Sequence, residues 1–554
     1  MGKSKWCCCL ASTLLCIVAL VCVCVATLMF TSCSGGFRHA AVAADSLLCS
    51  QVGKNMLQQG GSAVDGAIAA LLCTAVVYPQ SMGLGGGSVV TVRNKTGKVT
   101  VYNFRETVPR NFKSNLLDDC TGSKNMAGSQ WIGVPGELRG YEALHKRYGK
   151  LPWSKLFEEP VRLAREGLQV PPHLGKILAI PNVKRRIEQS SLCEVFCNNN
   201  KSVLETGDVI KFPQLAESME TIAKKGADVF YIGEMALDLI HDVKAAGGTL
   251  EMEDLRSYQT RVVDPWTVPL GDMLMHIPPP PAGGALLAFI LKIMQGFSMT
   301  PHSLEGEGKI QFYHHYIEAV KFANGQRRSI RDPFFNSEKS AEHLIDPDFI
   351  DHIRTMISSS GTHPPSYYSN VKPPPDHTGT SQVSVLDEDG LAVSATSTIN
   401  HLFGGGVYSP RTGIILNNEL ADFCGKVDTL KPGEQPPSSM TPAILESKSG
   451  GLLVIGGAGG SMITGAVALS VINHLWLGMS LKEAIDAPIV FVDSKNNVNF
   501  PPTFDQSVID GLKALGHQVG QMQYFFNIVN GVDKEKGCIM AESDARKNGM
   551  ADGY

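Results

Sequence analysis

The stretch His377-Thr378-Gly379-Thr380-Ser381-Gln382-Val383-Ser384-Val385 decides the fold of this chain, because a proline-rich extended connection (residues 361–375) gives way there to a strand. The turn Asp387-Glu388-Asp389-Gly390 follows, and residues 391–398 return as a second strand. A hairpin folded about this turn brings Thr380 opposite Thr398. Two hydroxyl groups are therefore predicted to meet at the open end of the hairpin.

A threonine hydroxyl is a poor nucleophile unless a base activates it, and the sequence shows neither a Gly-x-Ser-x-Gly motif nor a Ser-His-Asp order. A threonine at a chain terminus carries its own base, because a free α-amine has a pKa of about 7.7 to 8.0. We therefore predict a cut between Gly379 and Thr380, where glycine permits the dihedrals of a strained, self-cleaving bond. Taken alone, a Gly-Thr pair is more often an ordinary strand start, so other features must support the prediction.

The first residues carry a targeting signal. Lys3 and Lys5 precede an uncharged run (residues 6–30) that is longer than the roughly 20 residues needed to span a bilayer. We expect a cytoplasmic tail (1–5), an uncleaved signal-anchor helix (6–30) and an extracellular remainder, the topology of a type II plasma-membrane protein. A cleavable signal peptide is the alternative, although its apolar region is usually shorter. Palmitoylation of Cys7, Cys8 and Cys9 stays open.

Composition excludes little, but it narrows the partners. The chain has 554 residues, 43% of them hydrophobic, and a net charge of −4, so it can bury a large core and has no bulk attraction for nucleic acid. Several of its 14 cysteines lie beyond the anchor, where an oxidising compartment favours pairing, and Cys193 and Cys197 stand close enough to close a small loop. Two sequons at Asn94 and Asn200 predict glycan acceptors.

Between the anchor and the hairpin, the pattern predicts mostly helices. Small and apolar residues from 41 to 74 favour buried helices, and residues 135–342 have a largely helical period. The glycine cluster at 83–87 lies between a helix and a strand, the reverse of a nucleotide-binding loop, so we expect tight backbone packing there. His314 and His315 are adjacent on a helix and point in different directions, which favours packing over metal binding. Residues 456–460 are expected to form a glycine loop.

Taken together, these motifs resemble the γ-glutamyltransferase (glutathione hydrolase) family of N-terminal nucleophile hydrolases along essentially the whole chain. Within that family the segment 409–419 is most similar to the branch that cleaves leukotriene C4 as well as glutathione. The matching stretches are Pro79 to Gly87, Asn103-Phe104-Arg105-Glu106-Thr107, Gly379-Thr380, Thr396 to Asn400, Asn417-Asn418-Glu419, Pro437-Ser438-Ser439-Met440 and Gly456 to Gly460.

The resemblance implies an α+β fold, a four-layer αββα sandwich, cut into a large subunit (31–379) and a small catalytic subunit (380–554). It implies the disulfides Cys49 to Cys73 and Cys193 to Cys197, and no metal or cofactor. Partners implied are glutathione and its conjugates, water or an amino acid or dipeptide as acceptor, and the two chains of one precursor as a heterodimer.

The resemblance also assigns roles to single residues. It implies the nucleophile Thr380, its orienting partner Thr398 and an oxyanion hole at Gly459 and Gly460. For a zwitterionic γ-glutamyl group it implies carboxylate recognition by Arg105, Ser438 and Ser439, and ammonium recognition by Asn400, Glu419 and Asp422.

From residues alone, plainer alternatives exist. Arg105 would form a surface ion pair with Glu106, Glu419 and Asp422 would lie on a solvated helix face, and a Gly-Gly pair would be a turn. Many transferases of the family have Tyr-Phe where this chain has His401-Leu402-Phe403. We therefore expect a less firmly held lid and an altered choice of acceptor.

These features predict a cell-surface enzyme that forms a γ-glutamyl ester on Thr380. Two other functions stay open. One is an unprocessed, inactive paralogue that acts as a binding protein, and the other is an amidase of the same fold that cleaves other acyl amides.

Overall fold

The computed structural model describes residues 33, 35–121, 126–337, 341–369, 379–520 and 527–554. Among these residues no helix combines the length and the apolar character needed to cross a bilayer. The predicted cytoplasmic tail (1–5) and anchor (6–30) lie outside the described residues, as do residues 370–378, which include the last part of the proline-rich connection.

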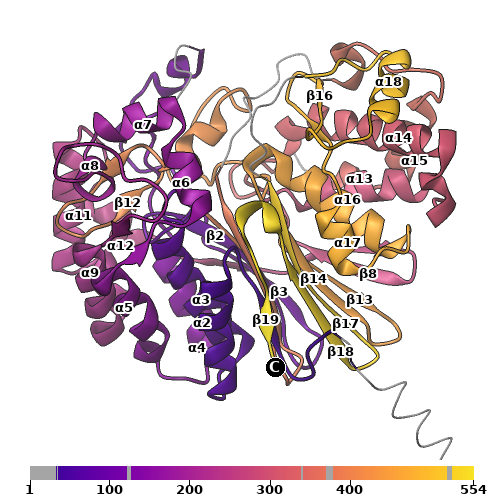
Figure 1. Ribbon diagram of the computed structural model, residues 1–554. Helices are drawn as coiled ribbons and strands as arrows, with labels where there is room; N and C mark the ends of the chain where they lie inside the picture. Colours follow the sequence, from indigo (N-terminus) through magenta and orange to yellow (C-terminus); the bar gives the residue numbers. More distant parts are fainter. Residues whose placement is uncertain (1–32, 34, 122–125, 338–340, 370–378, 521–526) are drawn as a thin grey trace, which may run out of the picture.

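Two antiparallel sheets lie face to face, and each is covered on its outer side by helices (Figure 1). One sheet has seven strands, in the order β19 (Asp552–Gly553), β1 (Ala41–Ala43), β9 (Ser381–Leu386), β10 (Ala392–Thr398), β2 (Gly87–Arg93), β3 (Val99–Asn103) and β6 (Arg261–Val263). The other has six, in the order β18 (Cys538–Ser543), β17 (Ile528–Glu535), β14 (Leu452–Ala458), β13 (Ala443–Ser447), β8 (Met273–Ile277) and β7 (Trp266–Leu270).

Small two-stranded sheets complete the strand inventory of the described chain: β4 (Leu168–Gln169) with β5 (Val209–Ile210), β11 (Val407–Tyr408) with β12 (Ile415–Leu416), and β15 (Phe491–Val492) with β16 (Val498–Asn499).

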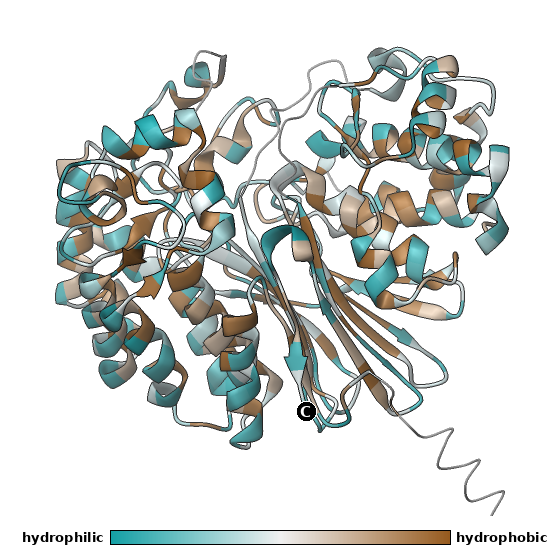
Figure 2. Ribbon diagram, viewed as in Figure 1, coloured by the Kyte–Doolittle hydropathy of each residue, from teal (hydrophilic) through white to brown (hydrophobic). Residues whose placement is uncertain are grey.

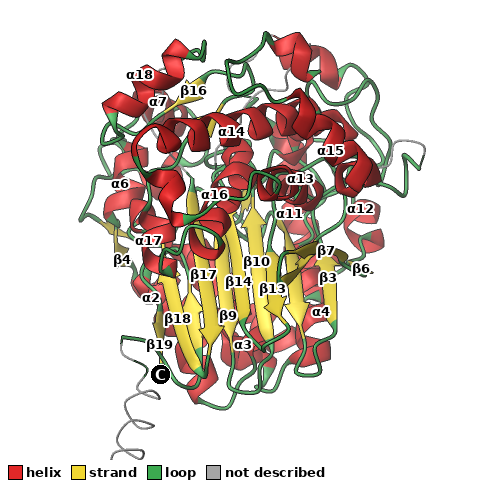
Figure 3. Ribbon diagram, turned by 90° about the vertical axis from the view of Figure 1, so that its right-hand side faces the viewer, coloured by secondary structure: helices red, strands yellow, loops and turns green. Residues whose placement is uncertain are grey.

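The helices fall into two groups on either side of the sheets. The group on the seven-stranded side is α2 (Leu47–Gln58), α3 (Ala63–Val77), α4 (Glu137–Tyr148), α5 (Glu158–Glu166), α6 (Pro172–Leu178), α7 (Pro181–Glu188), α8 (Cys193–Phe196), α9 (Pro213–Lys225), α10 (Asp228–Tyr231), α11 (Glu234–Ala245) and α12 (Met252–Ser257). The other group is α13 (Gly284–Gln295), α14 (Gly306–Gly325), α15 (Pro347–Met356), α16 (Ile463–Leu475), α17 (Leu481–Asp486) and α18 (Gln506–Ala514) (Figure 3).

Apolar residues gather where the helices face the sheets (Figure 2). Helix α3 is buried along its whole length, as its all-round apolar sequence requires, and Ser62 caps its N-terminus by accepting a hydrogen bond from the backbone N–H of Asp65. A third, smaller core lies between the sheets and includes Ala43, Leu386 and Val454. The α+β architecture, with two sheets between two helical layers, agrees with the prediction.

Three local predictions were wrong. Ala41–Ala43 forms strand β1, because pairing with β9 and β19 on both sides overrides its helical composition. Strands β6, β7 and β8 interrupt the region predicted to be helical, and a Gly-Asp turn at residues 271–272 joins the last two. The first three residues of the predicted glycine loop at 456–460 belong to strand β14, where the missing side chain of Gly456 leaves room for Gln382 of the opposite sheet.

The glycine cluster behaves as predicted. A Cβ atom on Gly85 would lie 2.2 Å from the carbonyl oxygen of Ile415, and one on Gly86 would lie 2.1 Å from that of Thr398. These are backbone atoms that cannot move aside, so the cluster sets how closely the chain passes the end of strand β10.

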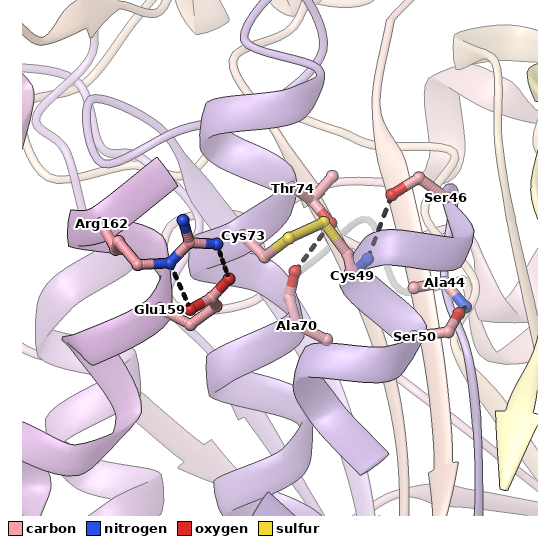
Figure 4. The surroundings of a disulfide bond; sticks show 9 residues. All are labelled: Ala44, Ser46, Cys49, Ser50, Ala70, Cys73, Thr74, Glu159 and Arg162. Atoms are coloured by element: carbon pink, nitrogen blue, oxygen red, sulfur yellow. Dashed lines mark hydrogen bonds and ion pairs between the residues drawn. A yellow bond between two sulfur atoms is a disulfide. The ribbon is translucent and has the colours of Figure 1, made fainter. Parts of the chain in front are cut away.

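Four disulfides are present among the residues that the structure describes. Cys49–Cys73 joins α2 to α3, as Figure 4 shows, and Cys193–Cys197 closes a short loop, so both agree with the predicted pairings. Cys33–Cys538 and Cys120–Cys424 join residues more than 300 positions apart, and the sequence did not indicate them.

The two sequon asparagines differ in exposure. Asn200 is exposed, whereas Asn94 is half-buried and its side-chain oxygen accepts hydrogen bonds from Thr96 and Lys98.

Candidate active site

The β9–β10 hairpin places the two threonines as the sequence predicted. Ser381 pairs with Ser397 in the ladder, so Thr380 stands opposite Thr398 one step further along. Their hydroxyl oxygens are 3.1 Å apart and share a hydrogen bond, and both residues are buried. The backbone N–H of Asn400 also donates to the Thr398 hydroxyl, at 2.8 Å, which fixes that side chain beside Thr380, the predicted nucleophile.

The backbone is strained at this junction. Thr380 has φ +80°, a left-handed conformation that a β-branched residue rarely adopts, and Gly379 before it has φ +141°. A Cβ atom on residue 379 would lie 2.0 Å from the carbonyl oxygen of Asn400, so only glycine fits there. The uncut peptide between Gly379 and Thr380 is thus held in a conformation that cleavage would relieve.

The carbonyl group of Gly379, where the cut is predicted, has a hydrogen-bond donor. The backbone N–H of Gly459 donates to the carbonyl oxygen of Gly379 at 3.0 Å. Gly459 follows strand β14 of the other sheet with φ +114°, and Gly460 opens the short 3-10 helix Gly460–Met462 next to it. A donor in this position stabilises negative charge on the oxygen when a nucleophile adds to the carbonyl carbon.

Lys547 is a residue that the sequence analysis missed. Its ammonium is buried and donates to the Thr380 carbonyl oxygen at 2.8 Å, and it forms an ion pair with Asp45 at 2.5 Å. Both partners lie far from Thr380 in the sequence, one near each end of the chain, and neither belongs to a local motif. The pair holds the backbone of Thr380 in place just before strand β9.

Arg105 lies directly after strand β3 and is fully buried. Its Nη1 contacts Glu419 and its Nη2 contacts Asp422, each at 2.5 Å. Its Nε and Nη2 also donate to the carbonyl oxygens of Pro436 and Pro437. The surface ion pair with Glu106 and the solvated helix face for Glu419 and Asp422 are therefore both excluded.

Glu419 keeps an unused acceptor in this buried charge cluster. Burial raises the pKa of Glu419 to about 7, although Arg105 lowers it. One carboxylate oxygen of Glu419, Oε2, is buried and has no hydrogen-bond partner among the described residues. An ammonium group is the ligand that such an oxygen can accept.

The remaining predicted residues surround the same space. Ser438 lies at the wall with its hydroxyl oxygen accepting from the backbone N–H of Met440, and Ser439 accepts from Arg327 at 2.7 Å. Asn400 has φ +73°, and its amide donates to the carbonyl oxygen of Asn418. One cavity is lined by every predicted catalytic and substrate-binding residue except Gly459: Arg105, Thr380, Thr398, Asn400, Glu419, Asp422, Ser438, Ser439 and Gly460. Its wall also includes Arg327 and Lys426, which the sequence analysis missed.

The segment His401-Leu402-Phe403, expected to be less firmly held, has several attachments. The Leu402 carbonyl oxygen accepts from Arg186 of helix α7, and the Phe403 ring packs edge-on against Phe196. Burial lowers the pKa of His401 to about 4, so its imidazole is neutral at physiological pH. The missing tyrosine therefore leaves a segment that other contacts hold in place.

His314 packs in the core rather than at the surface. It shares a hydrogen bond with His517, and the two lie near Glu318 in an arrangement that resembles a metal site. The Lys321 ammonium, however, contacts both His517 and Glu318. A cation of the protein itself therefore already contacts two of the three members of this cluster.

Comparison with known proteins shows the family of the chain. The family model described as gamma-glutamyltranspeptidase matches residues 49–554. The chain belongs to the γ-glutamyltranspeptidase family. Within this family, it is 48% identical to a rat (Rattus norvegicus) protein named glutathione hydrolase 5 proenzyme, over 94% of this chain and 93% of that one. The human (Homo sapiens) protein of the same name is 46% identical, with the same coverage.

Solved structures of similar fold include members of the γ-glutamyltranspeptidase family and an acylase. The crystal structure of cephalosporin acylase from Bacillus halodurans matches with a TM-score of 0.82 and 25% identity, covering 94% of this chain and 96% of that one. The γ-glutamyltranspeptidase of Helicobacter pylori matches with a TM-score of 0.53 and 28% identity, covering 58% of this chain and 92% of that one. The chain is thus an enzyme of the γ-glutamyltransferase and glutathione hydrolase class.

Proposed function

We propose that this enzyme hydrolyses and transfers the γ-glutamyl group of glutathione and of glutathione S-conjugates such as leukotriene C4, through an ester on Thr380. The observation that carries the proposal is the Thr380 hydroxyl beside a backbone N–H donor, at the wall of a cavity where the Arg105 guanidinium meets the carboxylates of Glu419 and Asp422. The names of the rat and human relatives, both glutathione hydrolase 5 proenzyme, support glutathione as substrate. The leukotriene conjugate rests on the resemblance of the segment 409–419.

The first step is self-cleavage. The Thr380 hydroxyl oxygen adds to the Gly379 carbonyl carbon, and the N–H of Gly459 stabilises the oxyanion. The C–N bond then breaks, the hydroxyl proton ends on the Thr380 nitrogen, and an ester joins the two residues. Water hydrolyses that ester, which leaves a Gly379 carboxylate, a free Thr380 hydroxyl and a new α-amine.

The mature enzyme would repeat the same chemistry on substrate. The Thr380 amine takes the hydroxyl proton, the oxygen attacks the γ-glutamyl carbonyl, and the proton passes to the departing cysteinylglycine nitrogen. The hydroxyl of Thr398 orients the nucleophile, and Gly459 and Gly460 bind the oxyanion. Attack by water on the γ-glutamyl ester gives glutamate, and attack by an amino acid or dipeptide gives transpeptidation. Apart from the substrate and the attacking water, amino acid or dipeptide, each of these steps uses only residues of the chain.

The substrate's α-ammonium is assigned to the carboxylate side of the cavity. Glu419 has an unpartnered oxygen there, and Asp422 and Asn400 line the same wall. The α-carboxylate is assigned to Arg105, Ser438 and Ser439, which lie together in the cavity.

The proposal includes two chains and a membrane location. Residues 31–379 would form the large subunit and residues 380–554 the small one, with the run at 6–30 as a signal anchor at the plasma membrane and the catalytic part outside. Four disulfides and the exposed sequon at Asn200 support an oxidising, extracellular environment.

The decisive experiment is N-terminal sequencing of the smaller fragment from a reduced denaturing gel, for wild type and Thr380→Ala. Wild type should give a fragment that begins at Thr380, and the variant should stay uncut. A single wild-type chain of about 60 kDa before glycans would favour the inactive binding protein instead.

An amidase with another acyl specificity is the second candidate, since the acylase fold matches over most of the chain. Equal rates on γ-glutamyl and glutaryl anilides would favour it, because the glutaryl group lacks the ammonium that Glu419 and Asp422 are assigned to bind.

A further inference from the structure

Lys426 lies in the substrate cavity, and its charge has no partner among the residues that the structure describes. It follows the 3-10 helix Glu419–Phe423 by three residues, and its side chain lines the cavity together with Thr380 and Arg105. The residue is only 7% exposed. Its ammonium makes no hydrogen bond or ion pair with any residue that the structure describes, and its backbone N–H donates to Phe423.

Burying an ammonium group without a partner is costly, so such a group is normally paired or bound to something else. The charged groups that act on Lys426 are the carboxylates of Asp422 and Glu419 and the guanidinium groups of Arg327 and Arg105. The two carboxylates are already held by Arg105 at 2.5 Å. Besides Arg105 and Arg327, the cavity therefore offers a cation, Lys426, that is not needed to balance the acids held by Arg105.

Arg105 itself has little capacity left. A guanidinium group has five N–H donors, and the contacts to Glu419, Asp422, Pro436 and Pro437 occupy four of them. A fork of two parallel hydrogen bonds to a substrate carboxylate is therefore blocked by the protein's own acceptors. The substrate carboxylate needs another cation nearby.

We propose that Lys426 binds the α-carboxylate of the γ-glutamyl group alongside Arg105, and so determines specificity for that acyl group. The inference rests on the proposed function and assigns its pocket a further substrate-binding residue. The α-carboxylate is the substrate group that fits, because the charged residues around Lys426 are those assigned to bind the γ-glutamyl group. The departing amine does not stay in that pocket.

The test compares three anilides that share one leaving group: γ-glutamyl, glutaryl, which lacks the ammonium, and 4-aminobutanoyl, which lacks the carboxylate. Purified wild type, Lys426→Gln, Lys426→Arg and the exposed control Lys448→Gln would be assayed for kcat and KM. A charged hydrogen bond of the expected strength corresponds to roughly a 10- to 100-fold change.

We expect Lys426→Gln to lose roughly 10- to 100-fold in kcat/KM on the γ-glutamyl and glutaryl anilides, mainly through KM, and to keep its rate on the 4-aminobutanoyl anilide. Lys426→Arg should recover most of the loss. Equal losses on all three substrates would show a structural role and overturn the inference. Glutathione would be assayed beside the anilides, and a loss seen only with glutathione would place Lys426 at the leaving group and also overturn the inference. Wild type that cleaves none of the anilides would refute the proposed function instead.

A separate observation concerns how the two chains stay together. Cys33 and Cys120 precede the predicted cut, whereas their partners Cys538 and Cys424 follow it. Cys120 lies in the 3-10 helix Leu116–Thr121, and Cys424 is buried directly after the helix that carries Glu419 and Asp422. The other two disulfides each lie within the large chain.

We infer that the mature enzyme is a covalent heterodimer, with two disulfides across the cut, an inference that rests on the proposed processing. On denaturing gels the wild type should run as one species without reductant and as two with it. Cys120→Ser/Cys424→Ser and Cys33→Ser/Cys538→Ser should each stay linked, and the variant with all four changes should separate without reductant. Two wild-type bands without reductant would overturn the linkage, and one band with reductant would refute the processing on which it depends.

Discussion

Replacement of Thr398 by valine tests how the nucleophile is held. Valine keeps the shape of the side chain and removes only the hydroxyl. The backbone should stay in place, because the Thr398 carbonyl oxygen is packed against Gly86. Two hydrogen bonds are lost, one shared with the Thr380 hydroxyl at 3.1 Å and one from the backbone N–H of Asn400 at 2.8 Å.

The second loss leaves a buried N–H without an acceptor, which costs about 1–3 kcal/mol of folding free energy. The first frees the Thr380 side chain to rotate away from the attack geometry. Because a misplacement of about 1 Å can cost roughly 100-fold in rate, we expect kcat to fall by about 10- to 100-fold and self-cleavage to slow similarly. Thr398→Ser, which keeps the hydroxyl, should stay near wild type.

The assay is anilide cleavage by purified protein, together with the cut fraction on a reduced gel and a urea unfolding curve. Measurements well below the unfolding midpoint separate the rate effect from the stability effect. A Thr398→Val enzyme that is fully cut and has wild-type kcat would refute the reasoning that this hydroxyl orients the nucleophile.

Three further predictions follow from the same structure. Arg105→Lys should lower kcat/KM by at least about 100-fold and destabilise the fold by about 3–5 kcal/mol, because one ammonium cannot serve two buried carboxylates. The control is Arg110→Lys, at an exposed ion pair, and an unaltered unfolding curve for Arg105→Lys would contradict this prediction. Gly86→Ala should yield little soluble, cut protein because its Cβ would lie 2.1 Å from a backbone oxygen, whereas Gly83→Ala, with open space around it, should behave as wild type, and equal yields would refute the packing argument. Burial lowers the pKa of Lys426 to about 8, so its ammonium is present below that pH and lost above it. The KM for the glutaryl anilide should therefore rise above about pH 8 in wild type and stay flat in Lys426→Arg. Parallel pH profiles of KM in the two proteins would argue against this assignment.

The part of the site that local sequence dictates was predictable. Strand alternation and an acidic turn gave the hairpin, and the hairpin alone aligned Thr380 with Thr398, because strand register follows from the position of the turn. The glycine cluster was also readable, since its position between a helix and a strand argued for packing rather than phosphate binding.

Residues joined only by tertiary folding were not predictable from local pattern. The ion pair between Lys547 and Asp45 spans 502 positions, and the disulfide between Cys33 and Cys538 spans 505. The buried charges around Arg105 looked like surface groups until the resemblance to a family placed them together. Strand β1 was missed because three alanine and valine residues carry no strand signal apart from their neighbours in the sheet.

The proposed nucleophile and its oxyanion donor belong to different sheets: Thr380 immediately precedes β9, and Gly459 follows β14. The distance between them is therefore set by how thick the layer of side chains between the sheets is, which depends on small residues such as Ala43 and Ala392 far from the reaction. Interiors of this kind are close-packed and barely compressible, so one added methylene in that layer would wedge the sheets apart and be felt as lost turnover. The catalytic rate of this enzyme thus depends on the distance between its two sheets. Variants with slow turnover will be found among residues that do not contact a substrate.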